Sequence, residues 1–340
     1  MRAVVLRDGG LEVRETADPV PGPGELLLRP LSAAICASDV HYMDHPNSAP
    51  RFVWDSGRDT IMGHEFIGEV VGHGPDCSGD FPIGSRVTSL PLLIRHGAEP
   101  RVIGHDPDAP GAFGELMLVS EVLSRTVPDR VPNDAVAVVD AFAVGEFYVR
   151  SSRIEPGELP LVVGAGAIGL SAVAALVARG VGPIVVSDYS VERLEYAKKF
   201  GADVLVNPAD RDPYAVWRET FRSNNFQTPQ VIFECVGAPG LLQNIVDSSE
   251  FLARVFAAGG WHGSDSVSVT AATHKGATIQ FGGGPHPVDW YGTLDAVVDG
   301  RLDPLPSIGR VIGLDEVPDA IDQARRSQGP PRVVVHPTAT

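Results

Sequence analysis

Cysteine is scarce in this chain: its 340 residues contain only three, Cys36, Cys77 and Cys235. A small, odd number of cysteines argues against a disulfide framework and agrees with a reducing compartment. Uninterrupted apolar runs of bilayer-spanning length are also missing, and the N-terminus becomes polar within its first ten residues. These absences predict a cytoplasmic protein without a membrane span.

Basic residues are also scarce relative to acidic ones. The chain has 27 Lys and Arg against 43 Asp and Glu, a formal net charge of -16, and no basic cluster. Such a surface repels phosphate backbones and anionic membranes, so we expect neither nucleic acid nor membrane as a partner. A chain of this length with 44% hydrophobic residues predicts two domains, each with its own core.

The apolar pattern changes character along the chain. The first 140 residues contain short Val- and Leu-rich runs separated by Gly and Pro, which predicts an antiparallel, barrel-like β domain. Later runs alternate with helical patterns, which is typical of a parallel sheet with helices on both faces. The predicted α/β chain therefore has a first domain at 1–145, completed by a returning tail at 286–340, and a second domain at 146–285.

A glycine-rich loop opens the second domain. The stretch "LVVGAGAIG" places Gly164, Gly166 and Gly169 in a G-x-G-x-x-G pattern, with Ala167 and Ile168 inside it, between an apolar strand and a helix. This pattern lets a backbone approach a pyrophosphate at a helix N-terminus. A glycine-rich turn without a ligand is the alternative. The register of strand, turn, helix and a later acid favours a dinucleotide site.

That later acid is Asp188, which ends the next apolar run 22 residues after Gly166. An acid there binds the ribose 2′-hydroxyl of NAD and would repel the 2′-phosphate of NADP. Tyr189 and Ser190 supply no cation, so the sequence favours NAD. Arg193 lies close enough in sequence to reach a phosphate, and it is therefore the residue that leaves NADP open.

Possible metal ligands occur in three separate stretches. The first, "ICASDVH", contains Cys36, and the second contains His64 and Glu65; Asp140 and Glu146 form the third. Cysteine, histidine and carboxylates all bind zinc, and a catalytic zinc site needs three protein ligands and one open position. Residue types alone leave open whether Cys36 is a ligand, a nucleophile or a small buried side chain.

Several motifs resemble one known superfamily over essentially the whole chain. "GHEFIGEVVGHG" followed by "GSRV" resembles the zinc-containing signature of medium-chain dehydrogenases/reductases, specifically the zinc-dependent alcohol and polyol dehydrogenases. "GAFGELMLV", "GAGAIG" and "FECVG" resemble later segments of the same family. The resemblance implies a GroES-like catalytic domain, a Rossmann domain, one catalytic zinc ion, NAD and a homodimer or homotetramer.

The resemblance also assigns the metal ligands. Cys36 and His64 match the first two catalytic zinc ligands, and Asp140 falls at the third position, which other members fill with cysteine, glutamate or aspartate. One thiolate and one carboxylate would neutralise the zinc charge. The proline that often follows the third ligand is Ala141 here. Glu65 matches an acid that either approaches the zinc ion or only supports it.

Four further residues receive roles from the same resemblance. Ser38 matches the hydroxyl that touches the bound alcohol, and His41 matches the histidine that passes its proton to solvent. Asp39 is predicted to orient a ligating imidazole through its other nitrogen. Arg332 falls where relatives place a cation on the cofactor pyrophosphate, although a solvated arginine at a strand end is the alternative.

The chain departs from the family pattern in two segments. Residues 90–116 contain no cysteine, whereas many relatives carry four there for a structural zinc ion, so we predict no structural zinc. His96 and His105 are expected to be ordinary loop histidines. The segment 45–60 is lengthened, and its Phe52 and Trp54 are predicted to line a substrate pocket together with Trp290. Packing for structural reasons alone is the alternative for these aromatic residues.

These observations predict an NAD-dependent zinc alcohol dehydrogenase acting on an alcohol or its ketone. The sequence favours a secondary alcohol, with a polyol or sugar alcohol next, and threonine also fits. The alternatives are a zinc-independent quinone or enoyl reductase of the same superfamily, which would use NADPH, and a non-catalytic binding protein. The acidic charge and the full set of candidate ligands weigh against both.

Overall fold

The structure is a computed structural model that describes residues 1–44, 57–224, 230–260, 264–326 and 329–338, with the side chains of residues 41, 42 and 44 left out. It divides into two compact units, residues 1–139 with 294–340 and residues 140–293. The expected boundaries were at residues 145 and 285. Among the described residues, no helix combines the length and the apolar character needed to cross a membrane.

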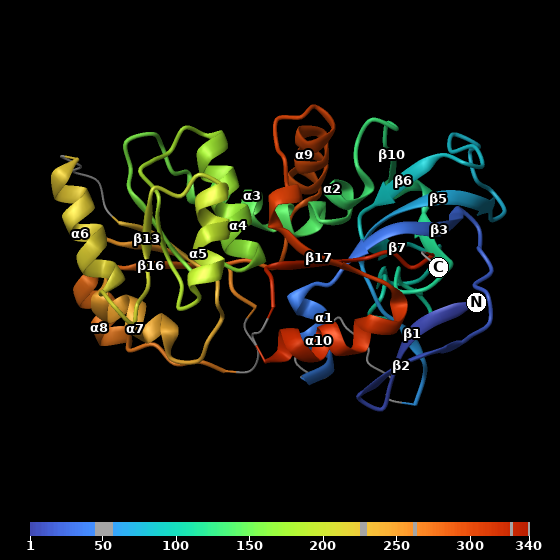
Figure 1. Ribbon diagram of the computed structural model, residues 1–340, viewed down its shortest axis with the longest axis horizontal. Coiled ribbons are helices and arrows are strands. Elements are labelled where there is room, and N and C mark those ends of the chain that lie inside the picture. Colours follow the sequence, from blue (N-terminus) through green and yellow to red (C-terminus); the bar gives the residue numbers. More distant parts are fainter. Residues whose placement is uncertain (45–56, 225–229, 261–263, 327–328, 339–340) are drawn as a thin grey trace. The chain divides into compact units, whose positions relative to one another are not determined.

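The first unit is built mainly from antiparallel strands (Figure 1). A seven-stranded sheet has the order β10-β6-β5-β3-β18-β17, with β9 also paired to β3; β2-β1-β4 and β7-β8 form two smaller sheets. The strands are β1 (Arg2–Arg7), β2 (Gly10–Glu15), β3 (Glu25–Ala34), β4 (Thr60–Ile61), β5 (Glu65–His73), β6 (Arg86–Ser89), β7 (Leu92–Leu93), β8 (Arg101–Val102), β9 (Met117–Ser120), β10 (Ser124–Thr126), β17 (Ile308–Ile312) and β18 (Arg332–Val335). The helices are α1 (Ala37–Asp44), α2 (Asn133–Ala137) and α10 (Val317–Arg325), with short 3-10 turns η1 (Glu121–Leu123), η2 (Leu305–Ser307) and η3 (Leu314–Glu316).

The C-terminal tail completes this first unit. Strand β18 pairs antiparallel with β3, so that Val334 lies opposite Ala34, and it pairs parallel with β17 on its other side. Its sequence, RVVV, suits a central strand because β-branched residues pack well on a pleated surface buried on both faces. The tail therefore supplies the last two strands at one side of the sheet, and β18 lies beside β3, the strand that leads into "ICASDVH".

The second unit contains a six-stranded parallel sheet in the order β13-β12-β11-β14-β15-β16. The strands are β11 (Pro160–Val163), β12 (Val185–Ser187), β13 (Val204–Val206), β14 (Val231–Glu234), β15 (Arg254–Ala257) and β16 (Thr278–Phe281). The helices are α3 (Val139–Ser152), α4 (Ala167–Ala178), α5 (Val191–Lys199), α6 (Pro213–Ser223), α7 (Leu241–Ser248) and α8 (Val269–Lys275). Helix α9 (Pro287–Val298) begins in this unit and ends in the first.

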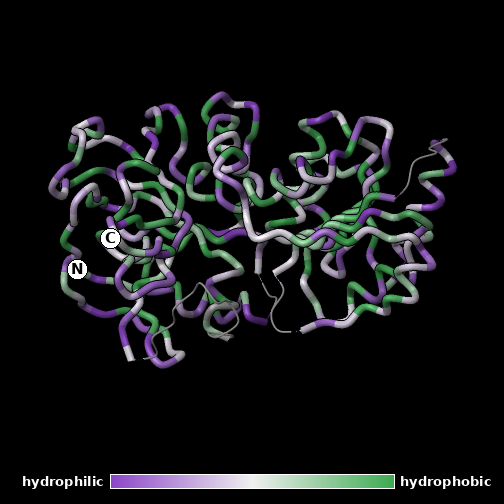
Figure 2. The backbone as a smooth tube through the Cα atoms, turned by 180° about the vertical axis from the view of Figure 1, so that it is seen from behind, coloured by the Kyte–Doolittle hydropathy of each residue, from purple (hydrophilic) through white to green (hydrophobic). Residues whose placement is uncertain are grey.

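The strand order explains where the helices lie. Successive strands are added on one side of β11 as far as β13, and this order then reverses, because β14 lies on the other side of β11. Right-handed crossovers therefore place α4 and α5 on one face of the sheet and α6, α7 and α8 on the other (Figure 1). The strands carry hydrophobic residues almost throughout, as Figure 2 shows, because both faces of the sheet are covered. The reversal lies between β11 and β14, where ligands bind in sheets of this kind.

Candidate active site

The register of the first unit's sheet gathers three of the predicted site residues. Glu65 begins β5 and pairs with Ala34, the last residue of β3. On the other side of β3, the backbone N–H of Ile35 donates to the carbonyl of Val333, which follows Arg332 in β18. Cys36, Glu65 and Arg332 therefore meet at one end of three neighbouring strands, although about 300 residues separate the first from the last.

His64 is held in place through one ring nitrogen. Its Nδ1 lies 3.1 Å from Asp39 Oδ1, and its Nε2 lies 3.2 Å from the hydroxyl of Ser38. An ionised carboxylate only accepts hydrogen bonds, so Nδ1 carries the proton and Nε2 is the nitrogen suited to a metal ion. Asp39 thus contacts the His64 imidazole, and metal binding by that imidazole stays a prediction.

Local helix geometry holds Asp39 in turn. Cys36 immediately precedes α1, and the Oδ2 atom of Asp39 accepts a hydrogen bond from the Cys36 backbone N–H at 2.9 Å. An acid at the third helical position commonly reaches back to the residue before the helix in this way. The spacing of Cys36 and Asp39 in "ICASDVH" thus connects the predicted ligand Cys36 with the carboxylate that contacts His64.

Charges at the site shift one another's proton affinities. Burial alone would raise the pKa of the Cys36 thiol, but the neighbouring His64 outweighs burial and lowers it. Burial also opposes the charged forms of His64 and Asp39; their mutual attraction nevertheless raises the pKa of His64 well above its ordinary value and lowers that of Asp39. A lowered thiol pKa favours the thiolate, which is the form that binds metals.

Glu65 and Arg332 form an ion pair, and their side chains are 0% and 1% exposed. Burial lowers the pKa of Arg332, while the nearby Cys36 opposes that shift. Arg332 is therefore not the solvated strand-end arginine considered as the alternative. Its contact with a cofactor pyrophosphate stays a prediction, and in this structure its charge is matched to Glu65 instead.

His105 differs from the expectation of an ordinary loop histidine. It lies in a turn, but its side chain is 4% exposed and its Nε2 lies 3.2 Å from Asp39 Oδ1. Its ring centroid is 4.7 Å from that of His64. The sequence did not predict this contact, because His105 follows Asp39 by 66 residues and no local pattern relates the two. Only the tertiary structure brings them together.

The ligand atoms of the first unit fit a metal ion. One ligand atom each from Cys36, His64 and Glu65 lie within 4.8 Å of one another, and the same is true of Asp39, His64 and His105. The two groups share His64. Because Asp39 accepts hydrogen bonds from both histidines, the second group forms a supporting network. The first group, with its thiol and the imidazole of His64, has the donor chemistry of zinc.

In the second unit, the three glycines of the loop 164–169 have different geometries. Gly164 has a φ of +96°, and a Cβ atom on Gly169 would lie 1.9 Å from the Gly164 carbonyl oxygen. A Cβ atom on Gly166 would meet nothing within 4 Å. The first glycine thus makes the turn, the third allows the helix to pack on it, and the second faces open space at the N-terminus of α4.

Asp188 lies directly after β12 and reaches this loop. Its Oδ2 accepts a hydrogen bond from the Ala165 N–H and its Oδ1 accepts one from the Ser190 N–H, both at 2.8 Å. The structure therefore brings Asp188 and the glycine loop together. Arg193 lies in the first turn of α5, where its backbone N–H donates to the Ser190 hydroxyl.

Asp140, the predicted third ligand, is in the first turn of α3 and belongs to the second unit. Its Oδ1 accepts a hydrogen bond from the indole N–H of Trp290 at 2.9 Å. Trp290 thus has a specific polar partner, and the prediction that it lines a substrate pocket stays untested. Glu146, another candidate ligand, forms an ion pair with Arg179.

Three predicted residues are beyond what the structure describes. Phe52 and Trp54 lie outside the described residues. His41 lies in α1, three positions after Ser38, but its side chain also lies outside them. Their predicted roles in the substrate pocket and in proton transfer stay predictions.

Comparison with known proteins identifies the family. Residues 22–129 match the alcohol dehydrogenase GroES-like domain, and residues 167–299 match the zinc-binding dehydrogenase family. The chain belongs to the zinc-dependent medium-chain dehydrogenase family. The family and the fold class predicted from the sequence are both confirmed, and membership in this family makes the chain an oxidoreductase of the dehydrogenase type.

Individual relatives of this family extend over nearly the whole chain. The L-threonine 3-dehydrogenase of Klebsiella pneumoniae subsp. pneumoniae is 28% identical over 335 residues, which cover 94% of each chain. The structure of 2R,3R-butanediol dehydrogenase from Bacillus subtilis has a TM-score of 0.84, 24% identity and 99% coverage of both chains. A Sinorhizobium meliloti 1021 structure bound to NADP matches with the same TM-score, identity and coverage. The two structures show the shared fold.

Proposed function

We propose that this dehydrogenase transfers hydride between a small secondary alcohol and NAD, with one catalytic zinc ion. The observation that carries the proposal is the arrangement of Cys36 and His64, with Nδ1 of His64 held by Asp39 and Nε2 facing the ligand cluster. A lone buried cysteine or a loop histidine would not need this support. The arrangement matches a metal-binding imidazole whose second nitrogen donates to a carboxylate.

The proposed ligands are Cys36, His64 and Asp140. Glu65 lies close enough to contribute, but Arg332 compensates its charge, which favours Asp140 as the third ligand. The hydrogen bond from Trp290 would orient the Asp140 carboxylate. When bound, zinc would act as a Lewis acid that lowers the pKa of an alcohol. The other protein groups then have to bind the substrate and move its proton.

Ser38 is suited to receive that proton. Its hydroxyl lies 3.2 Å from the proposed ligating nitrogen of His64, and a hydroxyl both accepts and donates a proton. Ser38 and His41 are three residues apart in α1. We therefore assign Ser38 and His41 as the proton path from alcohol to solvent, with histidine titrating near neutral pH.

The second unit would bind the dinucleotide. Gly164, Gly166 and Gly169 shape the loop, and the N-terminus of α4 with Ala167 and Ile168 offers backbone N–H groups to the pyrophosphate. Asp188 supports NAD over NADP, because its carboxylate is at the strand end where the ribose binds and would repel a 2′-phosphate. Arg193 is the nearby cation that would favour NADP if it reached that phosphate.

The substrate class rests on chemistry and on the relatives. L-threonine carries a secondary hydroxyl, and a 28% identical relative is an L-threonine 3-dehydrogenase, so L-threonine is the first substrate to test. Apolar secondary alcohols follow, and then polyols and sugar alcohols. A cytoplasmic location and a homodimeric or homotetrameric assembly belong to the same proposal.

The decisive experiment measures zinc content and activity together. Purified protein is analysed for metal and screened with NAD and NADP against L-threonine, secondary alcohols and polyols. We expect one zinc ion per chain and NAD reduction, both lost in Cys36→Ser. Cys77→Ser is the matched control, because Cys77 is also a half-buried cysteine of the first unit. Full activity with less than stoichiometric zinc would exclude the proposed mechanism and favour the zinc-independent reductase.

A further inference from the structure

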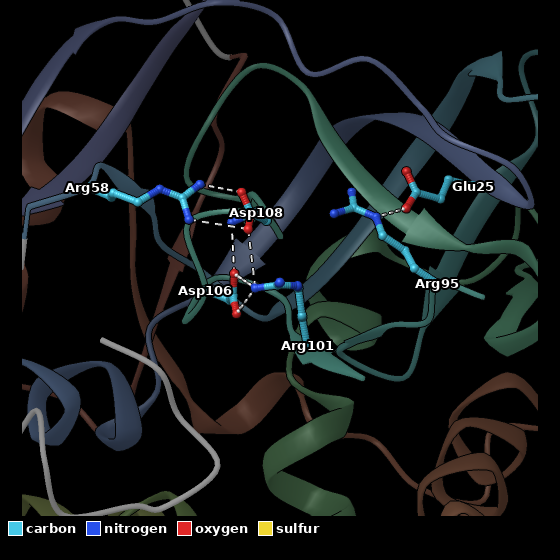
Figure 3. Close-up of polar contacts among 6 residues, drawn as sticks. All are labelled: Glu25, Arg58, Arg95, Arg101, Asp106 and Asp108. Atoms are coloured by element: carbon cyan, nitrogen blue, oxygen red, sulfur yellow. Dashed lines mark hydrogen bonds and ion pairs between the residues drawn. The ribbon is translucent and has the colours of Figure 1, made fainter. Parts of the chain in front are cut away.

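The cysteine-free segment around β8 is stabilised by ion pairs. The Arg101 guanidinium contacts both carboxylate oxygens of Asp106, at 2.8 and 2.7 Å, and lies 3.3 Å from Asp108. Arg58 forms a second ion pair with Asp108 (Figure 3). The Asp108 backbone N–H also donates to Asp106 Oδ1 at 2.8 Å. Arg101 and Arg58 thus hold the two aspartates that flank residue 107 in the turn.

The same turn packs directly against the residue before His64. The backbone N–H of Ala112 donates to the Gly63 carbonyl at 2.8 Å. Cβ atoms placed on Gly104 and Gly111 would lie 2.7 and 2.3 Å from the Gly63 carbonyl oxygen, so the two segments approach as closely as glycine allows. The turn that carries His105 is therefore fixed relative to the proposed zinc ligand.

His105 completes the surroundings of Asp39. The Asp39 carboxylate has three neighbours with hydrogen to donate: the Cys36 N–H to Oδ2, and His64 Nδ1 and His105 Nε2 to Oδ1. Because the carboxylate only accepts hydrogen bonds, the Nε2 atom of His105 must carry a proton. Burial, together with the neighbouring His64, lowers the pKa of His105.

We propose that His105 is a positioning residue of the metal centre, which holds Asp39 and through it orients His64 for zinc binding. Without His105, Asp39 would keep its two remaining donors, but Oδ1 would no longer be held from both sides. The carboxylate could then rotate away from His64 Nδ1. The ion pairs of Arg58, Arg101, Asp106 and Asp108 hold the turn that delivers His105. The zinc-related part of this inference rests on the proposed function.

The main test compares His105→Phe with His105→Gln. Phenylalanine fills the space without donating, whereas the Gln side-chain amide places an N–H near the former Nε2 position. We expect Zn²⁺ affinity, measured by competition with a chromophoric chelator, to fall about 10- to 100-fold in His105→Phe, the usual effect of losing an outer-shell partner. His105→Gln should recover most of this loss. His96→Gln, at an exposed histidine of the same segment, should bind Zn²⁺ as the wild type does.

Coupling to Asp39 separates positioning from packing. In an Asp39→Asn background, His105→Phe should weaken Zn²⁺ binding much less than it does in the wild type, because its route through the carboxylate is already impaired. Equal losses in both backgrounds would overturn the proposal. Wild-type affinity in His105→Phe, or no recovery in His105→Gln at an unchanged melting temperature, would overturn it as well.

A measurement on metal-free protein keeps this inference distinct from the proposed function. The His64 Nδ1–H resonance, observed by ¹⁵N-edited NMR, should exchange faster with water in His105→Phe and at the wild-type rate in His105→Gln. If the wild type failed to bind stoichiometric zinc, the proposed function would fall, while this exchange rate would still decide whether His105 positions His64. An unchanged rate in His105→Phe would overturn the inference even if zinc binds.

Discussion

Two candidate sites are built by opposite means: the proposed nucleotide loop of the second unit, and the cluster of candidate metal ligands in the first unit with its supporting residues. The loop is contiguous, residues 164–169, and works through backbone groups where side chains are missing. The cluster takes Cys36, His64 and Arg332 from distant parts of the chain and works through side chains whose charges are matched in pairs. Gly164 and Gly169 of the loop leave no room for an added methyl group. We expect the cluster, in contrast, to lose stability when one of its paired charges is removed.

The largest expected effect comes from breaking a buried charge pair in the cluster. Arg332→Met leaves the Glu65 carboxylate buried without its partner, which should cost about 3–5 kcal/mol of unfolding free energy. Urea denaturation of the first unit's transition measures it. The double variant Glu65→Gln/Arg332→Met should recover part of the loss.

Arg29→Met is the control for this prediction. Arg29 pairs with Glu69 in the same sheet, but its side chain is 46% exposed, so its loss should cost less than about 1 kcal/mol. If Arg332→Met were no more destabilising than Arg29→Met, the buried ion pair between Arg332 and Glu65 would not stabilise the cluster.

The next prediction compares two glycines of the loop, one without room for a methyl group and one with open space beside it. In Gly169→Ala the new methyl group collides with the Gly164 carbonyl, which should destabilise the second unit by about 1–3 kcal/mol. Gly166→Ala adds the same methyl group in open space, so thermal stability should be retained while NAD binding weakens. Melting curves with and without NAD distinguish the two. Equal stability losses would show that the loop geometry differs from the one described.

A third prediction concerns Asp188, whose carboxylate accepts a hydrogen bond from the loop. Asp188→Asn removes the negative charge beside Ala165, which should weaken NAD binding about tenfold, near the lower end for a hydrogen bond to a charged group, and should reduce discrimination against NADP. Asp203→Asn is the control, because Asp203 also accepts a backbone N–H in this unit, from Ile184. NAD and NADP titrations of both variants measure the ratio. An unchanged ratio in Asp188→Asn would mean that the ribose contact lies elsewhere.

The smallest expected effect concerns Asp140, the proposed third ligand. Trp290→Phe removes one hydrogen bond to Asp140, worth about 1 kcal/mol, which corresponds to an approximately fivefold loss of Zn²⁺ affinity. Trp217→Phe removes the equivalent indole bond to the Leu159 carbonyl in the same unit. It should lower the melting temperature without changing Zn²⁺ affinity. The same affinity in both variants would contradict a role for Trp290 in orienting a ligand.

Much of the nucleotide loop could be predicted from sequence because its parts are neighbours along the chain. The strand, the three glycines, the helix and Asp188 follow in a short, fixed order, and local backbone geometry forces them together. The link between Cys36 and Asp39 was predictable for the same reason, since one turn of helix α1 joins them. Such features need no knowledge of the rest of the fold.

Other parts of the site were not predictable because long-range packing creates them. Nothing near His105 indicates a buried carboxylate, and the strand-end position of Arg332 suggested a solvated or phosphate-binding side chain. Sheet pairing across β5, β3 and β18 brings Arg332 to Glu65, and the close packing of the 101–111 turn on Gly63 brings His105 to Asp39.

The sequence by itself determined the fold class and the family, and it predicted the dinucleotide loop and the ligand residue types, because each depends on local periodicity or on a contiguous motif. The tertiary structure alone decided which partner each carboxylate has: Arg332 for Glu65, His105 for Asp39, and Trp290 for Asp140. The physical reason is that a buried charge or polar group must find a partner, and the partner is chosen by packing across the sheet rather than by distance along the chain.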